Sequence, residues 1–249
     1  MPLKTWSTKA DYDGIYYARL EPDGHPASRP AVVVNYCRWL DYPWHQTAAT
    51  NLISILGLQP TQRIVLVGSG FAWTLEALVL EHGFDPARVV GVDTSAYVHS
   101  AKATSEEADI RAAISAVGLD PNTGRGAELL ARAWDGGARV RAGIRIINET
   151  LTNNASRRRT RDAVGQPIDW VISEVMLESL TDNEAILASQ NVHAIDAPTT
   201  GVAHIVTTQH SGTDRYGNPV SFNLKSLAAW KALLPADRFI DALTWEQVL

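Results

Sequence analysis

The sequence of 249 residues has one cysteine and no long apolar run. A single cysteine, Cys37, excludes an internal disulfide. The apolar runs are far shorter than the roughly 20 residues that a membrane-spanning helix needs. The first residues, "MPLKTWSTKADYDG", also lack the apolar core of a secretory signal. We therefore expect a cytoplasmic protein that is not held in a membrane.

Positive charge is also scarce. Lys and Arg number 22 against 27 Asp and Glu, and the net charge of −5 argues against a general nucleic-acid-binding surface. Four arginines gather in "ASRRRTRDAVGQP", residues 155–167, which we interpret as a solvated loop, with contact to phosphate or to an acidic partner as the alternative. No cluster of His, Asp and Glu has the spacing of metal ligands, so we expect no metal site.

The chain divides into two unequal parts. Residues 1–45 are rich in turn residues and aromatics, and we interpret them as an N-terminal arm that ends in an aromatic segment, residues 36–46. That segment either covers a site or contacts a protein partner or a second copy of the chain, since aromatic residues and arginine are enriched at interfaces. Residues 46–249 form the main domain.

The main domain alternates strand and helix patterns. Strands are predicted at 63–69, 87–95, 143–150, 168–175, 200–210 and 238–245, and helices at 42–58, 71–83, 95–118, 124–137, 177–195 and 223–234. Thr181 and Glu184 have the spacing of a capping box. The alternation predicts an α/β fold of the Rossmann-like, doubly wound type, with a mostly parallel sheet and helices on both faces.

The stretch "RIVLVGSGFAW" carries the first functional signal. Gly68 and Gly70 follow the first strand, where a turn without side chains lets a ligand approach the backbone. Asp93 ends the second strand 23 residues after Gly70, a distance typical of a carboxylate that binds ribose hydroxyls. The pair suggests an adenosyl ligand. Alternatively, Asp93 caps the next helix together with Thr94 and Ser95.

The turn favours one adenosyl ligand over another. A dinucleotide site needs a small residue where this chain has Trp73, and no set of residues for hydride transfer is recognisable. The stretch from Gly68 to Ala72 instead resembles the glycine turn of class I S-adenosylmethionine-dependent methyltransferases. The order of motifs from Arg63 to His210 is similar to that family as well.

The resemblance implies S-adenosylmethionine as the cofactor. In the family the end of the second strand holds the ribose, a polar residue after the third faces the adenine, and the end of the fourth lies beside the methyl donor. Carried over by position, the cofactor contacts are Gly68, Ser69, Gly70, Ala72, Asp93, Thr94, Asn148, Glu149 and Ser173. One position departs from the family, because Leu66 stands where an acidic residue usually helps to fix the methionine end of the cofactor.

Methyl transfer requires alignment of the acceptor and, for some acceptors, removal of a proton. Glu174, at the end of the fourth strand, and His210, after the fifth, are the candidate catalytic residues. Glu178 is expected to face solvent on a helix. "ISEVML" lacks the Pro-Pro-aromatic element of enzymes that methylate amines of DNA bases, and there is no Pro-Cys nucleophile for cytosine, so a DNA substrate is disfavoured.

Two functions remain. The first is methyl transfer to a small molecule or an undetermined acceptor. The second is a non-catalytic subunit with the same fold, which acts through its N-terminal arm in a structural or assembly role. The order of motifs and Asp93 favour the first, whereas Leu66 favours the second.

Overall fold

The computed structural model describes residues 44–70, 72–94, 107–116, 118–131, 143–152, 154–164, 167–195, 199–208 and 223–249. The N-terminal arm up to residue 43 and His210, a candidate catalytic residue, lie outside these residues. None of the described helices is long and apolar enough to cross a membrane.

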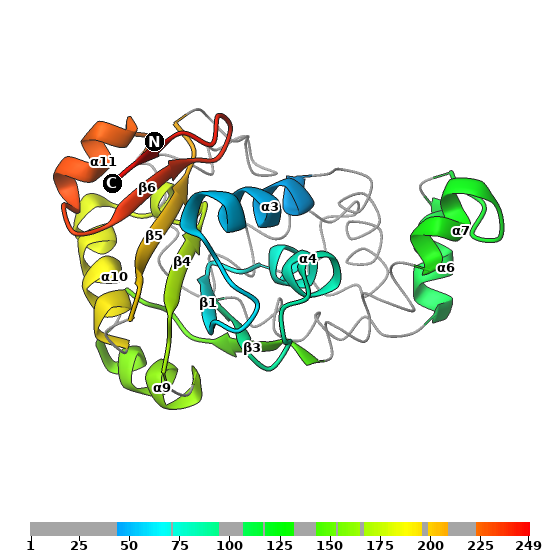
Figure 1. Ribbon diagram of the computed structural model, residues 1–249, viewed down its shortest axis with the longest axis horizontal. Helices are drawn as coiled ribbons and strands as arrows, with labels where there is room; N and C mark the ends of the chain where they lie inside the picture. Colours follow the sequence, from blue (N-terminus) through cyan, green and yellow to red (C-terminus); the bar gives the residue numbers. More distant parts are fainter. Residues whose placement is uncertain are drawn as a thin grey trace, which may run out of the picture.

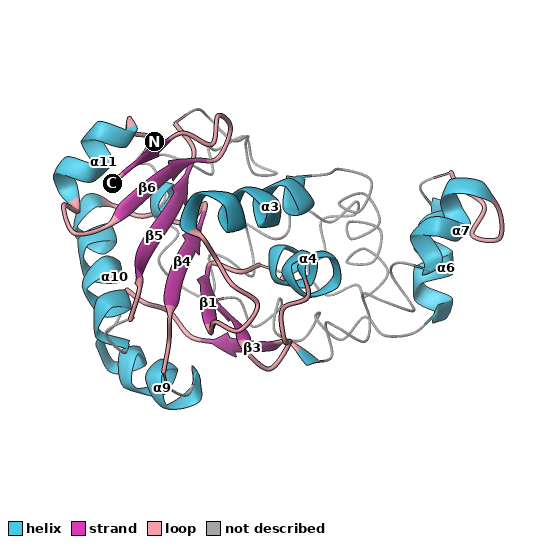
Figure 2. Ribbon diagram, viewed as in Figure 1, coloured by secondary structure: helices cyan, strands magenta, loops and turns pink. Residues whose placement is uncertain are grey.

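The described chain is built around one sheet (Figure 2). Its strands are β1 (Ile64–Val67), β2 (Val89–Asp93), β3 (Arg145–Asn148), β4 (Trp170–Glu174), β5 (Gly201–Val206), β6 (Arg238–Asp241) and β7 (Gln247–Val248). They lie in the order β3-β2-β1-β4-β5-β6-β7, and every neighbouring pair is parallel except β6 and β7. The predicted mostly parallel α/β sheet is therefore confirmed.

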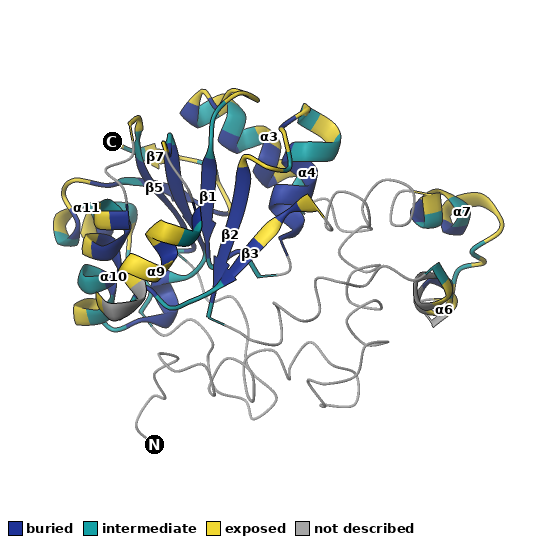
Figure 3. Ribbon diagram, turned by 90° about the horizontal axis from the view of Figure 1, so that it is seen from below, coloured by how far each residue is buried: buried dark blue, intermediate teal, exposed yellow. Residues whose placement is uncertain are grey.

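Helices cover both faces of this sheet (Figures 1 and 3). On one face lie α3 (Trp44–Leu56) and α4 (Trp73–His82), and on the other lie α9 (Asn154–Val164), α10 (Asp182–Ile195) and α11 (Leu227–Leu233). Two further helices, α6 (Glu107–Ala116) and α7 (Gly124–Leu130), pack beside each other at the far right of Figure 1. Because both faces are covered, β1, β2 and β4 are buried along their whole length.

The alternation of side chains along each strand divides the core in two. Leu66 of β1 and its partner Ile172 of β4 pack on the side of α3 and α4, and Val67 packs on the side of α10 and α11. Full burial of one such aliphatic side chain stabilises the fold by about 1.5–3 kcal/mol. In the same alternation, Ser173 and Glu174 at the end of β4 face opposite helical layers.

Three details refine the predicted elements. The arginine-rich stretch is not a loop but helix α9, which is consistent with the high helix propensity of arginine and the lack of Gly and Pro between 154 and 164. Its arginines are exposed, as expected. The chain also ends in β7, a short antiparallel edge strand that the pattern did not predict. The capping box is confirmed, because the Thr181 amide and the Glu184 amide each bond the other residue's side chain.

Candidate functional site

The turn after β1 combines several unusual backbone conformations. Gly68 (φ 71°), Gly70 (φ 51°) and Ala72 (φ 62°) all have positive φ, and α4 begins directly after them. A side chain at Gly68 would be strained by this φ and would lie 3.1 Å from Cβ of Met176 and 3.2 Å from the carbonyl oxygen of Glu174. Glycine at 68 therefore lets the ends of β1 and β4 approach each other closely.

Asp93 reaches this turn from β2. Its Oδ2 accepts a hydrogen bond of 2.9 Å from the Gly70 amide, and the residue is only 6% exposed. The two residues that the sequence paired at a distance of 23 positions are thus in direct contact. The carboxylate is oriented toward the glycine turn. The helix that Asp93 would cap in the alternative interpretation begins outside the described residues.

The end of β3 is bonded to the end of β2. The Asn148 side chain donates to the carbonyl of Thr94 at 3.0 Å, and the Glu149 amide donates to the carbonyl of Asp93 at 3.1 Å. The Glu149 carboxylate in turn accepts two hydrogen bonds, of 2.5 and 3.0 Å, from the Arg159 guanidinium on α9. These bonds fix the polar groups that follow two neighbouring strands.

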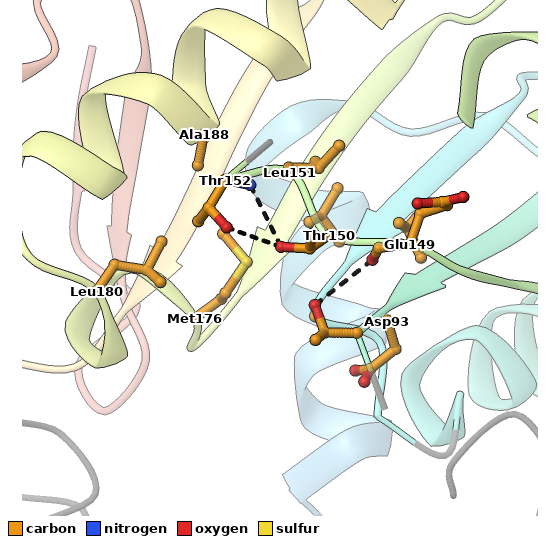
Figure 4. A pocket seen from close by; sticks show the side chains of 12 residues that line it. Asp93, Glu149, Thr150, Leu151, Thr152, Met176, Leu180 and Ala188 are labelled. Atoms are coloured by element: carbon orange, nitrogen blue, oxygen red, sulfur yellow. Dashed lines mark hydrogen bonds between the residues drawn. The ribbon is translucent and has the colours of Figure 1, made fainter. Parts of the chain in front are cut away.

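A pocket lies at the carboxyl ends of β1, β2 and β3 (Figure 4). Asp93, Thr94 and Glu149 bring polar groups to it, and Leu151, Met176, Leu180 and Ala188 of α10 bring apolar side chains. The lining residues are Val67, Gly68, Val92, Asp93, Thr94, Glu149, Thr150, Leu151, Thr152, Met176, Leu180 and Ala188. Carboxylates and hydroxyls together with apolar side chains suit a ligand with a hydroxylated ring and a flat apolar portion.

The predicted cofactor residues separate into two groups around this pocket. Four of them, Gly68, Asp93, Thr94 and Glu149, line it. The lining does not include Ser69, Gly70, Ala72, Asn148 or Ser173. The Ser69 hydroxyl is buried with no hydrogen-bond partner among the described residues, and a side chain at Gly91 of β2 would lie 2.5 Å from it.

The Ser173 side chain points into the layer of α10 and α11 and does not line the pocket. Its hydroxyl lies 2.7 Å from Nδ1 of His204, whose Nε2 lies 2.8 Å from Oδ2 of Asp237. Ser189 also donates to this carboxylate, at 2.6 Å, and His193 bonds its other oxygen. We call these five residues the interior network.

The interior network has the residue types of a serine hydrolase triad but not its accessibility. Ser173 and His204 are each 1% exposed and Asp237 is 0% exposed, so no substrate reaches them. Burial alone would raise the pKa of Asp237, but the hydrogen bonds and charge of His204, with the bonds from Ser189 and His193, lower it to about 2. The network is a satisfied, charged link between β4, β5, β6 and α10.

Glu174 points the other way, toward α3 and α4. Its Oε1 accepts a hydrogen bond of 2.7 Å from the Thr74 hydroxyl, which lies 2.8 Å from Nδ1 of His45. His45 Nδ1 is itself 3.6 Å from the same carboxylate oxygen. We call His45, Thr74 and Glu174 the strand-end cluster. The next residue, Val175, has a φ of 46°, which is strained for a β-branched side chain.

Glu178 was expected to face solvent, and this prediction is wrong. It lies in the short 3₁₀ helix Leu177–Ser179, which follows β4 directly, and is 0% exposed. Its Oε1 accepts a hydrogen bond of 2.6 Å from the Thr207 amide, and Oε2 has no hydrogen-bond partner among the described residues. Burial raises the pKa of Glu178 to about 7, the Thr207 bond opposes the rise, and the nearby charge of Asp241 adds to it.

The sequence reasoning missed several members of these clusters. His204 and Asp237 gave no signal, because they stand far apart in apolar or turn-like surroundings, and only the sheet brings them to Ser173. Thr74 looked like an ordinary helix residue. Among the described residues, no group of three or more His, Cys, Asp and Glu side chains could hold a metal ion.

Comparisons with known proteins give matches in structure only. Neither a family model nor a curated protein matches the sequence. The structure is similar to that of the glycopeptide N-methyltransferase MtfA in complex with sinefungin, with 11% identity, a TM-score of 0.38, and coverage of 63% of this chain and 51% of that one.

Two further similar structures cover more of the chain. One is a SAM-dependent methyltransferase from Aquifex aeolicus, with 12% identity, a TM-score of 0.45, and coverage of 81% of this chain and 86% of that one. The other concerns the conversion of a disulfide bond into a thioacetal group during echinomycin biosynthesis, with 11% identity, a TM-score of 0.46, and coverage of 81% and 75%. The Rossmann-like fold of this chain follows from its own strand order and strand directions.

Proposed function

We propose that this protein binds S-adenosylmethionine at the carboxyl ends of β1 and β2 and transfers its methyl group to a small-molecule acceptor. One observation carries the proposal: the carboxylate that ends β2 is bonded to the glycine turn that follows β1, beside a pocket. Ligands of doubly wound sheets bind at this edge. When bound, the cofactor would supply a methyl group that its sulfonium already activates.

The residues present fit the adenosyl part of this cofactor. Each carboxylate oxygen accepts more than one hydrogen bond, so Asp93 can accept from a ribose hydroxyl while it holds the Gly70 amide. Thr94 and Glu149 add polar groups, and Met176 and Leu180 offer an apolar wall to a flat ring. These residues would bind and orient the cofactor.

The methionine end of the cofactor fits less well. Leu66 is buried in the core on the side of α3 and α4, so it offers no charge to an ammonium group. Glu174 ends β4 with a carboxylate, but this carboxylate already accepts a hydrogen bond from the Thr74 hydroxyl. Glu174 and His210 remain the proposed groups near the reacting atoms, and the acceptor is proposed to be a small molecule rather than a nucleic acid.

The test is a calorimetric titration with S-adenosylmethionine and with S-adenosylhomocysteine. We expect micromolar binding that Asp93→Ala weakens about 10- to 100-fold, the range for loss of a charged hydrogen bond. Asp169→Ala is the matched control, because Oδ2 of Asp169 also accepts a backbone hydrogen bond, of 2.8 Å from Arg63, but at the opposite edge of the sheet. Absence of binding to the wild type at millimolar ligand would refute the proposal.

A second function has one observation in its favour. Leu66 replaces a cofactor-binding carboxylate with a core side chain, which would suit a fold kept for shape alone. In that case the protein would act as a structural or assembly subunit, with residues 1–45 as its contact to a protein partner or to a second copy. A failed titration together with a stable oligomer would favour this function.

A further inference from the structure

We infer that His45 is the general base that takes the proton of a hydroxyl acceptor, and that Thr74 and Glu174 are the positioning residues that hold its imidazole. This inference rests on the proposed methyl transfer and names the group that removes the proton. Three contacts within the strand-end cluster carry it.

The directions of the hydrogen bonds determine the tautomer of His45. The Thr74 hydroxyl has one hydrogen, which it donates to Glu174 Oε1 at 2.7 Å. Toward His45 the same oxygen can therefore only accept, so Nδ1, at 2.8 Å, has to carry a hydrogen. A neutral imidazole protonated on Nδ1 has its lone pair on Nε2, the form in which it accepts a proton there.

The cluster also places a carboxylate beside the imidazolium that His45 becomes after it takes up a proton. Oε1 of Glu174 lies 3.6 Å from Nδ1 of His45, and the Glu174 side chain is only 8% exposed. A carboxylate at that distance in a poorly solvated position stabilises the imidazolium that forms when Nε2 takes up a proton. Glu174 thus acts through His45, and its own oxygen is occupied by Thr74.

The position of the cluster matches a catalytic role. Its members come from α3, from the start of α4 and from the end of β4, so three separate segments bring them to the carboxyl edge of the sheet. The carbonyl of Glu174 lies against Gly68, which also lines the pocket. The strained Val175 follows Glu174 directly, and strain of this kind concentrates at functional sites.

Aromatic rings surround His45 and indicate the kind of acceptor. The centroid of the His45 ring lies 4.9 Å from that of Trp44 and 5.4 Å from that of Trp73, both in edge contacts. The ring centroid of Trp245 lies 6.2 Å from that of Trp44. The His45 side chain is 15% exposed and its Nε2 is covered, so an acceptor has to displace covering atoms to reach it. Aromatic walls favour a hydroxyl carried on an apolar ring.

The reaction balances without a further reagent. The acceptor oxygen forms a bond to the methyl carbon while the carbon–sulfur bond breaks, and the sulfur keeps the electron pair of that bond. The hydroxyl proton passes to Nε2 of His45 and is later released to water. The products are the methyl ether, the neutral thioether and one proton.

The first test does not depend on turnover. Long-range proton–nitrogen NMR spectra of the imidazoles, with His45 assigned by His45→Gln, report which ring nitrogen carries the hydrogen. We expect the Nδ1–H tautomer in the wild type and in Thr74→Ser, and a mixture of tautomers in Thr74→Val. An Nε2–H tautomer in the wild type would overturn the inference, because that nitrogen could not take up a proton.

The second test measures transfer of labelled methyl to a panel of phenols and naphthols. We expect His45→Gln to lower the rate about 100-fold or more, the usual contribution of a general base, with cofactor affinity within about threefold of the wild type. His82→Gln is the matched control, since His82 lies 3.3 Å from the hydroxyl of Thr50 at an exposed position and has no salt bridge to a carboxylate among the described residues. Its rate should not change.

The two proposals fail in different ways. A wild type that binds no S-adenosylmethionine in the calorimeter refutes the proposed function itself. A wild type that binds the cofactor but methylates no phenol or naphthol, or an unaltered rate in His45→Gln, overturns only the inference about His45 and its acceptor.

Discussion

Ser173 and Glu174 are consecutive residues of β4, and each is linked to a histidine, but on opposite faces of the sheet. Ser173 belongs to the interior network, in which the carboxylate and His204 are almost fully buried and bonded. Glu174 belongs to the strand-end cluster, in which the histidine stays partly exposed beside aromatic rings. Residue types alone therefore do not distinguish a structural polar network from the catalytic cluster that we propose, whereas the exposure of the histidine differs, with 1% for His204 and 15% for His45.

The largest expected effect breaks the interior network. Asp237→Ala leaves His204 buried without its carboxylate, and we expect it to cost about 3–5 kcal/mol in the free energy of unfolding, measured with urea. Asp162→Ala removes an exposed carboxylate that is paired with Arg161, and its effect should stay within about 0.5 kcal/mol. A cost below about 1 kcal/mol for Asp237→Ala would show that the network is not a structural element.

The next effect concerns Glu178, whose pKa of about 7 lies above its ordinary value of 4.5. The folded state keeps this proton where the unfolded chain has lost it, so the contribution of Glu178 to stability is present below pH 4.5 and is lost as the pH rises through 7. Relative to the wild type, Glu178→Gln should therefore gain about 3 kcal/mol between pH 4 and pH 8.

The control for Glu178 is an exposed glutamate. The Glu128 side chain is 68% exposed on α7, and Glu128→Gln should change little between the same pH values. Urea unfolding of the three proteins at both pH values supplies the comparison. Parallel pH profiles for the wild type and Glu178→Gln would contradict the buried carboxyl described above.

The third effect concerns Gly68 in the turn after β1. Gly68→Ala has to place a methyl group at positive φ and 3.1 Å from Met176, so we expect a loss of about 2 kcal/mol and weaker cofactor binding. Gly83→Ala has a similar φ of 74° with no atom within 4 Å, and it should cost only about 1 kcal/mol and leave binding unchanged. Equal effects of the two changes on cofactor affinity would argue against a site at the β1 turn.

The smallest expected effect concerns the capping box at the start of α10. Thr181→Ala removes the hydroxyl that accepts from the Glu184 amide at the start of α10, and we expect a loss of about 1 kcal/mol. Cofactor affinity should stay within about threefold of the wild type, because Thr181 itself does not line the pocket, whereas Leu180 and Ala188 do. Calorimetry and thermal unfolding of the same sample check both statements, and a tenfold loss of affinity would show that the cap of α10 is needed for cofactor binding.

The sequence predicts the sheet well because its signals are local. Continuous apolar runs such as "RIVLVGS" are typical of strands that are buried on both faces. Gly68 and Gly70 directly follow such a run, and Asp93 ends another, so their meeting at one edge of the sheet could be predicted. The burial of Glu178 could not be predicted in this way. Glu178 contacts the amide of Thr207, which is 29 residues away, and the chain reaches it through Val175 in a left-handed conformation that no rule of propensity favours for valine.

The polar clusters could not be predicted for a different reason. His204 lies inside the apolar run of β5, and its partners Ser173 and Asp237 are 31 and 33 residues away. Thr74 and Glu174 are 100 residues apart. Contacts at such distances follow from strand order and register, which a single sequence does not contain.

The most direct test of the difference between the two faces is to follow the imidazole resonances of the seven histidines while S-adenosylmethionine is added. A catalytic role of His45 beside the bound cofactor predicts that the resonances of His45 shift with saturation, whereas those of His204 and His193 in the interior network stay in place. Shifts at His204 without shifts at His45, or saturation that moves neither, would contradict the placement of the site.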